Sequence, residues 1–189
     1  MDPSFIYSFV FGLFLGLSIA APPGPVNAII ANESLRSNLH GTAVGAGAMT
    51  ADLIFFIIVF SIRGYIPSFI LKYIYIFSSI LLLYLAYGVL RSEKSERSVH
   101  GNFIVGLTMG ITNPYQIAWW LTVGIFMLDR YSLVSSYGFF SGILLWIIIF
   151  PLTVKRYLER FSTYVKYFSF VTLIIFAIII LYSGLTGNI

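Results

Sequence analysis

The chain has 189 residues, of which 59% are hydrophobic and 10% are charged, with a formal net charge of +4. Soluble domains contain about 45–50% apolar and about 25% charged residues, so a mean hydropathy of +0.93 excludes an ordinary water-soluble domain and predicts a membrane protein. There is no cysteine, which excludes disulfide bonds, thiolate metal sites and thiol redox chemistry.

The hydrophobic residues form segments long enough to cross a bilayer, because about 20 helical residues span the roughly 30 Å hydrocarbon layer. The sequence predicts six such segments, at residues 5–31, 41–62, 66–90, 103–128, 132–153 and 164–186. The first segment has no basic region before it and runs into Pro22-Pro23-Gly24-Pro25. Since a signal peptide would have both a basic start and a cleavage site, we expect a span of the mature protein.

Short polar connections join the segments, and the longest, at 91–100, carries mixed charges typical of a hydrated linker. We therefore expect one membrane domain without an appended soluble domain. It consists of a first three-helix repeat at 1–92, a cytoplasmic linker at 93–102 and a second three-helix repeat at 103–189.

Lysine and arginine are distributed unevenly between the two sides of the predicted membrane domain. The connections after the first, third and fifth segments hold eight of these residues, and the opposite side holds three. By the positive-inside rule the first set is cytoplasmic. This predicts a multi-pass protein of the cytoplasmic (inner) membrane with both termini outside. Basic residues interleaved with tyrosine and phenylalanine at 155–167 indicate contact with lipid headgroups rather than nucleic acid.

Glycine motifs of the first three segments recur in the last three, at offsets of 94, 97 and 96 residues. The matched glycines are Gly12 with Gly106, Gly41 with Gly138, and Gly88 with Gly184. Any one of these glycines is explained by close helix packing, but the nearly constant offset indicates an internal repeat. Because each half has three spans, the second half must be inverted, as in many secondary transporters. The predicted fold class is an all-α membrane protein with six transmembrane helices in two inverted three-helix repeats.

The first helix of each predicted repeat is interrupted by proline, at 21–27 and at 112–116. A proline removes an amide donor and frees a carbonyl, which the membrane tolerates only inside protein or beside a wet cavity. Two breaks in corresponding positions therefore predict a substrate site at the repeat interface. The polar residues beside the breaks either satisfy freed backbone groups or bind ligand; they are Asn27, Thr112, Asn113 and Gln116.

Asp52 is the one acidic residue inside a predicted span, near the middle of the second segment. A charge at that depth costs about 2.5–3.5 kcal/mol, and such residues commonly relay protons or cations. The alternative is a permanently neutral carboxyl that is hydrogen-bonded to a neighbouring helix. Of the adjacent Trp119 and Trp120, one is expected to line the cavity while the other packs, and Trp146 is expected to pack.

Several of these motifs together resemble the LysE/RhtB amino-acid exporters over about residues 5–150. They are Pro23-Gly24-Pro25 at the end of the first helix, Gly45 with Asp52 in the second, and Asn113-Pro114 in the fourth. The resemblance implies an inner-membrane carrier that exports amino acids or related small metabolites, driven by the proton-motive force, with neither a cofactor nor enzymatic activity. It also implies a functional set of Pro23, Gly24, Pro25, Asp52, Asn113 and Pro114, to which the breaks add Asn27 and Gln116 as substrate- or ion-binding residues.

The chain departs from the family pattern at two positions: Ala51 stands where the family usually has glycine, and Tyr115 stands where it often has lysine. The expected partners are a small-molecule substrate, protons and membrane lipid, and a homodimer is left open. The nearest alternative function is a cation exporter of the same superfamily, which would show several acidic, asparagine or histidine ligands in its spans. A non-catalytic membrane scaffold is another, and it predicts that Asp52 is dispensable.

Overall fold

The computed structural model describes residues 3–22, 24–91 and 102–186. All secondary structure in these residues is helical, with no strand among them, so the prediction of an all-α protein is confirmed. Two described segments are long and apolar enough to cross a membrane, Asn38–Tyr65 and Leu133–Val154. Shorter apolar helices occur at Ser4–Ala20, Lys72–Tyr84, Phe103–Thr112 and Phe170–Thr186.

The first half of the chain forms four α-helices and one 3₁₀ turn. They are α1 (Pro3–Ala20), α2 (Pro25–Arg36), α3 (Asn38–Ile62), η1 (Arg63–Tyr65) and α4 (Ser68–Arg91). The first predicted segment is thus two helices, because Pro25 lacks the amide that would continue α1 but suits the first position of a new helix. Most of the linker predicted at 93–102 lies outside the described residues; Asn102 is described, and its side chain caps the next helix.

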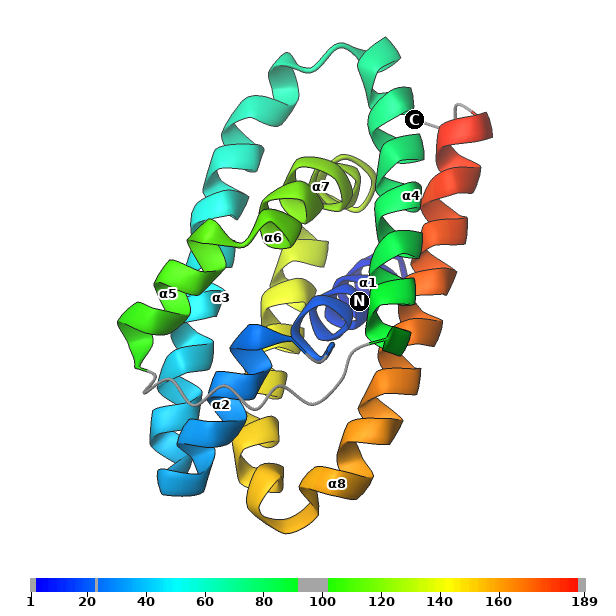
Figure 1. The fold of residues 1–189 in the computed structure, drawn as a ribbon. Coiled ribbons are helices and arrows are strands. Elements are labelled where there is room, and N and C mark those ends of the chain that lie inside the picture. Colours follow the sequence, from blue (N-terminus) through cyan, green and yellow to red (C-terminus); the bar gives the residue numbers. More distant parts are fainter. Residues whose placement is uncertain (1–2, 23, 92–101, 187–189) are drawn as a thin grey trace.

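The second half contains the remaining helices. They are α5 (Phe103–Thr112), α6 (Pro114–Trp119), a π-helical segment η2 (Trp120–Gly124), α7 (Ile125–Arg130) and α8 (Ser132–Thr186). The fourth predicted segment is therefore interrupted at Asn113, and its helical turn is wider at the π-helical segment η2. Figure 1 shows α5 crossing α3, with α6 and α7 continuing from it across the molecule toward α4.

The fifth and sixth predicted segments differ from the expectation of two separate helices. Helical backbone continues from Ser132 to Thr186, with Pro151 inside it, and Figure 1 shows α8 turning back on itself so that its yellow and red arms lie apart. Residues 152–166 contain no glycine or proline, and these are the residues that most strongly end helices. Helical hydrogen bonding therefore persists between the two apolar arms.

Glycines bring the helices of the two halves into backbone contact. A Cβ at Gly12 on α1 would overlap the carbonyl oxygen of Ser135 on α8, and one at Gly106 on α5 would overlap that of Val44 on α3. Such close approach is typical of small residues between membrane helices. The broken first helix of each half thus packs against a helix of the other half.

These contacts pair the glycines of the two halves differently from the pairing that the sequence motifs suggested. A Cβ at Gly138 would overlap the carbonyl oxygen of Phe9, and the equivalent overlap at Phe103 comes from Gly47. Gly41, which spacing alone paired with Gly138, instead faces Ser34 of the neighbouring α2. The pairing of Gly41 with Gly138 was wrong, because the two glycines face different kinds of neighbour, α2 and α1. Spacing along the sequence does not reveal which helix a glycine faces.

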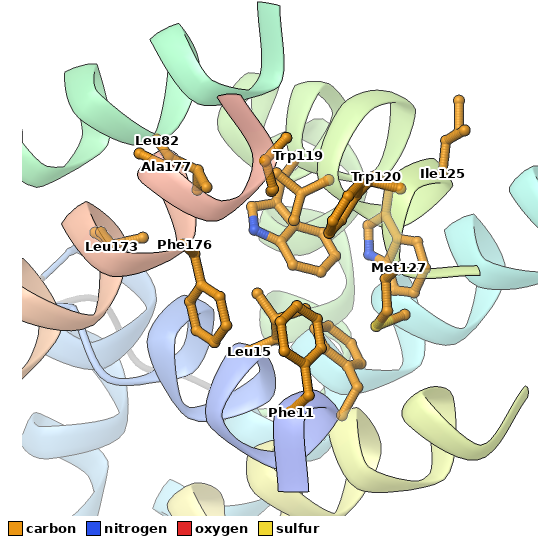
Figure 2. Packing of buried hydrophobic residues seen from close by; sticks show 14 of the residues in the cluster. Phe11, Leu15, Leu82, Trp119, Trp120, Ile125, Met127, Leu173, Phe176 and Ala177 are labelled. Carbon is orange, nitrogen blue, oxygen red and sulfur yellow. The ribbon is translucent and has the colours of Figure 1, made fainter. Parts of the chain in front are cut away.

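The interior of the helix bundle is aromatic. Trp119 and Trp120 are 1% and 0% exposed, and Trp119 stacks on Phe139 with ring centroids 5.0 Å apart. Figure 2 shows the two indole rings beside each other, above Phe11 and Leu15 of α1. On the outside, large apolar side chains are widely exposed on α1, α3, α4 and α8, as expected for a surface in contact with lipid rather than water.

The end of the second broken helix is fixed to the first half. The Arg63 guanidinium donates to the carbonyl of Leu128, and a cation is favourable at a helix C-terminus. The Tyr75 hydroxyl donates to Asp129 Oδ2 at 2.6 Å. Together these bonds hold α7 against η1 and α4.

Candidate substrate cavity

Both helix breaks face a single cavity of about 350 Å³. Five of the eight residues predicted to bind substrate or ion are among its described lining: Gly24, Asn27, Asp52, Asn113 and Gln116. The rest of the lining comes from α1, α2, α3, α4, α6 and α8, and it is mostly apolar. The volume is within the range of small-molecule sites, which combine apolar walls with a few placed polar groups.

At the first break α1 ends at Ala20 and α2 begins at Pro25, and Asn27 binds two backbone carbonyls of the break. Its Nδ2 donates to the carbonyls of Ala20 at 2.6 Å and Pro22 at 2.8 Å. Its Oδ1 accepts a hydrogen bond from Trp146 Nε1 at 3.1 Å. Asn27 therefore closes the break in its own half and ties it to α8 of the other half.

At the second break Asn113 alone is non-helical, because α5 ends at Thr112 and α6 starts at Pro114. The Asn113 Oδ1 accepts from the amide of Tyr115 at 3.0 Å, which is the usual work of an N-cap. Gln116 is then free to reach another helix. Its Nε2 donates to Asp52 Oδ1 at 2.7 Å.

Asp52 is 6% exposed and lies on α3 at the wall of the cavity. Its Oδ1 accepts two hydrogen bonds, from Gln116 and from Trp120 Nε1 at 2.8 Å. Both donors come from the second broken helix, on the α6 and η2 segments. The carboxyl of the first half is therefore held by the second half, at the level of the break.

The other residues predicted from the sequence at the two breaks are three prolines and Thr112. Pro25 and Pro114 each begin a helix, which accounts for the position of the breaks. Pro23 lies outside the described residues. Thr112 donates to the carbonyl of Thr108 at 2.8 Å, is exposed and does not line the cavity. It therefore belongs to the end of α5.

Trp119 lines the cavity while Trp120 packs and binds Asp52, so the expectation of different roles agrees with the structure. The expectation for Trp146 was incomplete: it stacks on Phe150 at 4.8 Å, but it also lines the cavity and donates to Asn27. A tryptophan in mid-span carries an N–H that needs a partner when buried. This need for a partner was the sequence signal that could have predicted a hydrogen bond from Trp146.

Two further findings extend the sequence prediction. Glu33, which follows the first predicted span, lies on α2 and is 1% exposed, 3.5 Å from Arg36, so Asp52 is not the only buried acid. Ala51, in place of the family's glycine, lies opposite Gly110, where a second Cβ would approach to 2.6 Å. Ala51 is accommodated because Gly110 has no side chain.

The polar groups of the cavity are amides, hydroxyls, indole N–H groups and one carboxyl. Among the described residues no three His, Asp or Glu side chains form a cluster that could hold a metal ion. The arrangement can hydrogen-bond a small polar molecule and balance one positive charge.

Comparison with known proteins gives two matches. The family model described as "LysE type translocator" matches residues 17–185. A Bacillus subtilis (strain 168) protein named "Putative amino acid efflux protein YcgF" is 27% identical over 165 residues, which cover 77% of this chain and 79% of that protein. No solved structure matches the chain.

Proposed function

Because this chain belongs to the LysE type translocator family, we propose that it is a secondary transporter that exports amino acids or related small metabolites across the cytoplasmic membrane in exchange for protons. The observation that carries the proposal is the cavity between the two breaks, with the Asp52 carboxyl at its wall. The relative named for amino acid efflux gives the substrate class.

The proposed architecture has six spans in two inverted repeats, with both termini outside. The crossed contacts support it: α1 packs on α8 through Gly12, and α5 packs on α3 through Gly106. Two halves that meet around a central cavity suit alternating access, in which one unit rocks against the other around a fixed site.

Proton coupling rests on Asp52, the one acidic residue that lines the cavity in the described part of the chain. A carboxyl can cross a low-dielectric state when it is neutral and needs a polar partner or water when it is charged. The cation-exporter alternative would need several further ligands, and among the described residues the lining offers amide and hydroxyl oxygens but no second acidic or histidine side chain beside Asp52.

The test is transport in proteoliposomes that contain the purified protein, with a panel of amino acids and divalent cations. We expect counterflow of an amino acid and its accumulation under an imposed pH gradient. Asp52→Asn keeps the shape and the acceptor oxygen but cannot release a proton, so it should insert normally and lose uphill transport. Asp129→Asn, which alters a carboxylate away from the cavity, is the matched control. Movement of a cation without any amino acid would reverse the assignment.

A further inference from the structure

The two oxygens of Asp52 have different surroundings. Oδ1 accepts from Gln116 and Trp120, whereas Oδ2 receives no hydrogen bond from the residues that the structure describes. Asp52 retains 6% exposure and lines the cavity. Oδ2 is therefore the oxygen that can take a ligand without disturbing the contact to the second half.

Other charges cannot substitute for Asp52 in this cavity. Besides Asp52, the described lining has two titratable residues, the tyrosines Tyr84 and Tyr115, and their hydroxyl oxygens lie 3.3 Å apart. Among the described side chains, the charged residues on elements packed against α3 do not line the cavity; they are Glu33, Arg36, Arg63, Asp129 and Arg130. An ammonium group that leaves water for such a site needs an opposite charge, and Asp52 supplies it.

We infer that Oδ2 of Asp52 is a shared site at which a proton and the ammonium group of the cargo exclude each other. The inference rests on the proposed function and adds its coupling mechanism: exchange follows from competition for one oxygen. A site of this kind needs no second proton-binding residue.

The exchange balances in atoms and charge. On the cytoplasmic side the carboxylic acid of Asp52 releases its proton to water, and the carboxylate then binds the ammonium of the cargo. On the outer side the cargo leaves and a proton returns to Oδ2. One proton thus enters the cell for each cargo molecule exported. For a cargo that is a neutral zwitterion, one positive charge moves inward in each cycle.

A cargo with one ammonium group and an uncharged side chain suits this cavity best. Beside Asp52 the cavity wall is formed by apolar residues, including Met49, Ile143, Ile147 and Leu173. The side-chain ammonium of lysine would have to be buried against these apolar residues, which costs free energy, whereas the side chain of leucine suits them. The structure therefore favours amino acids such as leucine over lysine.

The experiment measures binding of L-leucine to the purified full-length protein at about pH 6 and about pH 8. Competition predicts that the apparent Kd rises as the pH falls, by up to about tenfold per pH unit where Asp52 is protonated. In weakly buffered solution at the lower pH, leucine should release up to one proton per molecule bound. L-Lysine and 2-hydroxy-4-methylpentanoate, which lacks the ammonium, should bind at least about tenfold more weakly.

Variants separate this inference from the proposed function. Asp52→Asn should weaken leucine binding by about tenfold or more and remove both its pH dependence and the proton release, whereas Asp129→Asn should behave as the parent protein does. Leucine affinity that is the same at both pH values and in Asp52→Asn, alongside intact gradient-driven export, overturns competition but leaves the transporter standing. Absence of any amino acid transport overturns the proposed function itself. The proton-release measurement uses the unmodified protein, so it decides the matter even if Asp52→Asn does not fold.

Discussion

The two helix breaks begin with the same sequence device and use it differently. Each has an amide residue two positions after a helix-starting proline, Asn27 after Pro25 and Gln116 after Pro114. Asn27 turns back to the carbonyls of its own break, whereas Gln116 reaches Asp52 on another helix. A break of several residues needs its amide for closure. A break of one residue, capped by Asn113, leaves its amide available for the site.

The difference separates stability from transport. The first break should be the more sensitive part of the fold, and the second should control the carboxyl. Substitutions at equivalent positions of the two breaks test whether one serves stability and the other transport. Substitutions in the glycine packing that both halves share should give the largest effect for comparison.

The largest effect is expected at the glycines that both halves use for packing. Gly12→Leu and Gly106→Leu each place a side chain against backbone of the facing helix, Ser135 or Val44. Because overpacking against backbone cannot relax easily, both variants should fail to yield folded protein. The measurement is recovery of monodisperse protein in detergent. Gly64→Ala, with nothing within 4 Å, should be recovered normally. If only one glycine were sensitive, the two halves would not share this packing.

The second effect concerns Gln116. Gln116→Ala removes one of the two donors to Asp52 Oδ1, and a hydrogen bond to a charged group contributes about 1.5–3 kcal/mol. We expect gradient-driven export to fall by about tenfold or more, with only a modest change in thermal stability. Initial rates in proteoliposomes give the first quantity and detergent melting curves the second. Unchanged export would mean that Trp120 alone positions the carboxyl.

Asn27 should show the opposite balance. Asn27→Ala leaves the carbonyls of Ala20 and Pro22 and the N–H of Trp146 without their side-chain partner. A buried group that loses its partner costs about 1–3 kcal/mol, and water in the cavity can replace part of the loss. Thermal unfolding in detergent should therefore show a loss of about 2 kcal/mol or more. A variant as stable as the parent would place the closure of the break elsewhere.

The smallest effect is expected at Asn113. Asn113→Ala removes the cap on the amide of Tyr115 and should cost about 1 kcal/mol. Asn113→Asp keeps the capping oxygen and is the matched control for stability. Equal melting temperatures for the alanine and aspartate variants would show that the cap oxygen contributes little.

Sequence reasoning predicted the all-α class, the helix breaks and several of the residues that line the cavity, because these depend on local chemistry. Proline positions determine where helices stop, and hydropathy determines which segments are buried in lipid, so α2 and α6 begin at Pro25 and Pro114 as the motifs indicated. The family followed from short motifs, and the match over residues 17–185 agrees with it.

Only the tertiary structure decided which groups meet. The donors to Asp52, the partner of Trp146, the burial of Glu33 and the pairing of Gly138 with the Gly47 position all depend on contacts between distant segments. A sequence pattern gives the face and spacing of a residue along its own helix. It does not give the neighbour across the interface, because that depends on how close the glycines allow the backbones to approach. The sequence by itself therefore identified Asp52 as the unusual carboxyl, and the packing of the two halves directed both of its described hydrogen-bond donors to Oδ1.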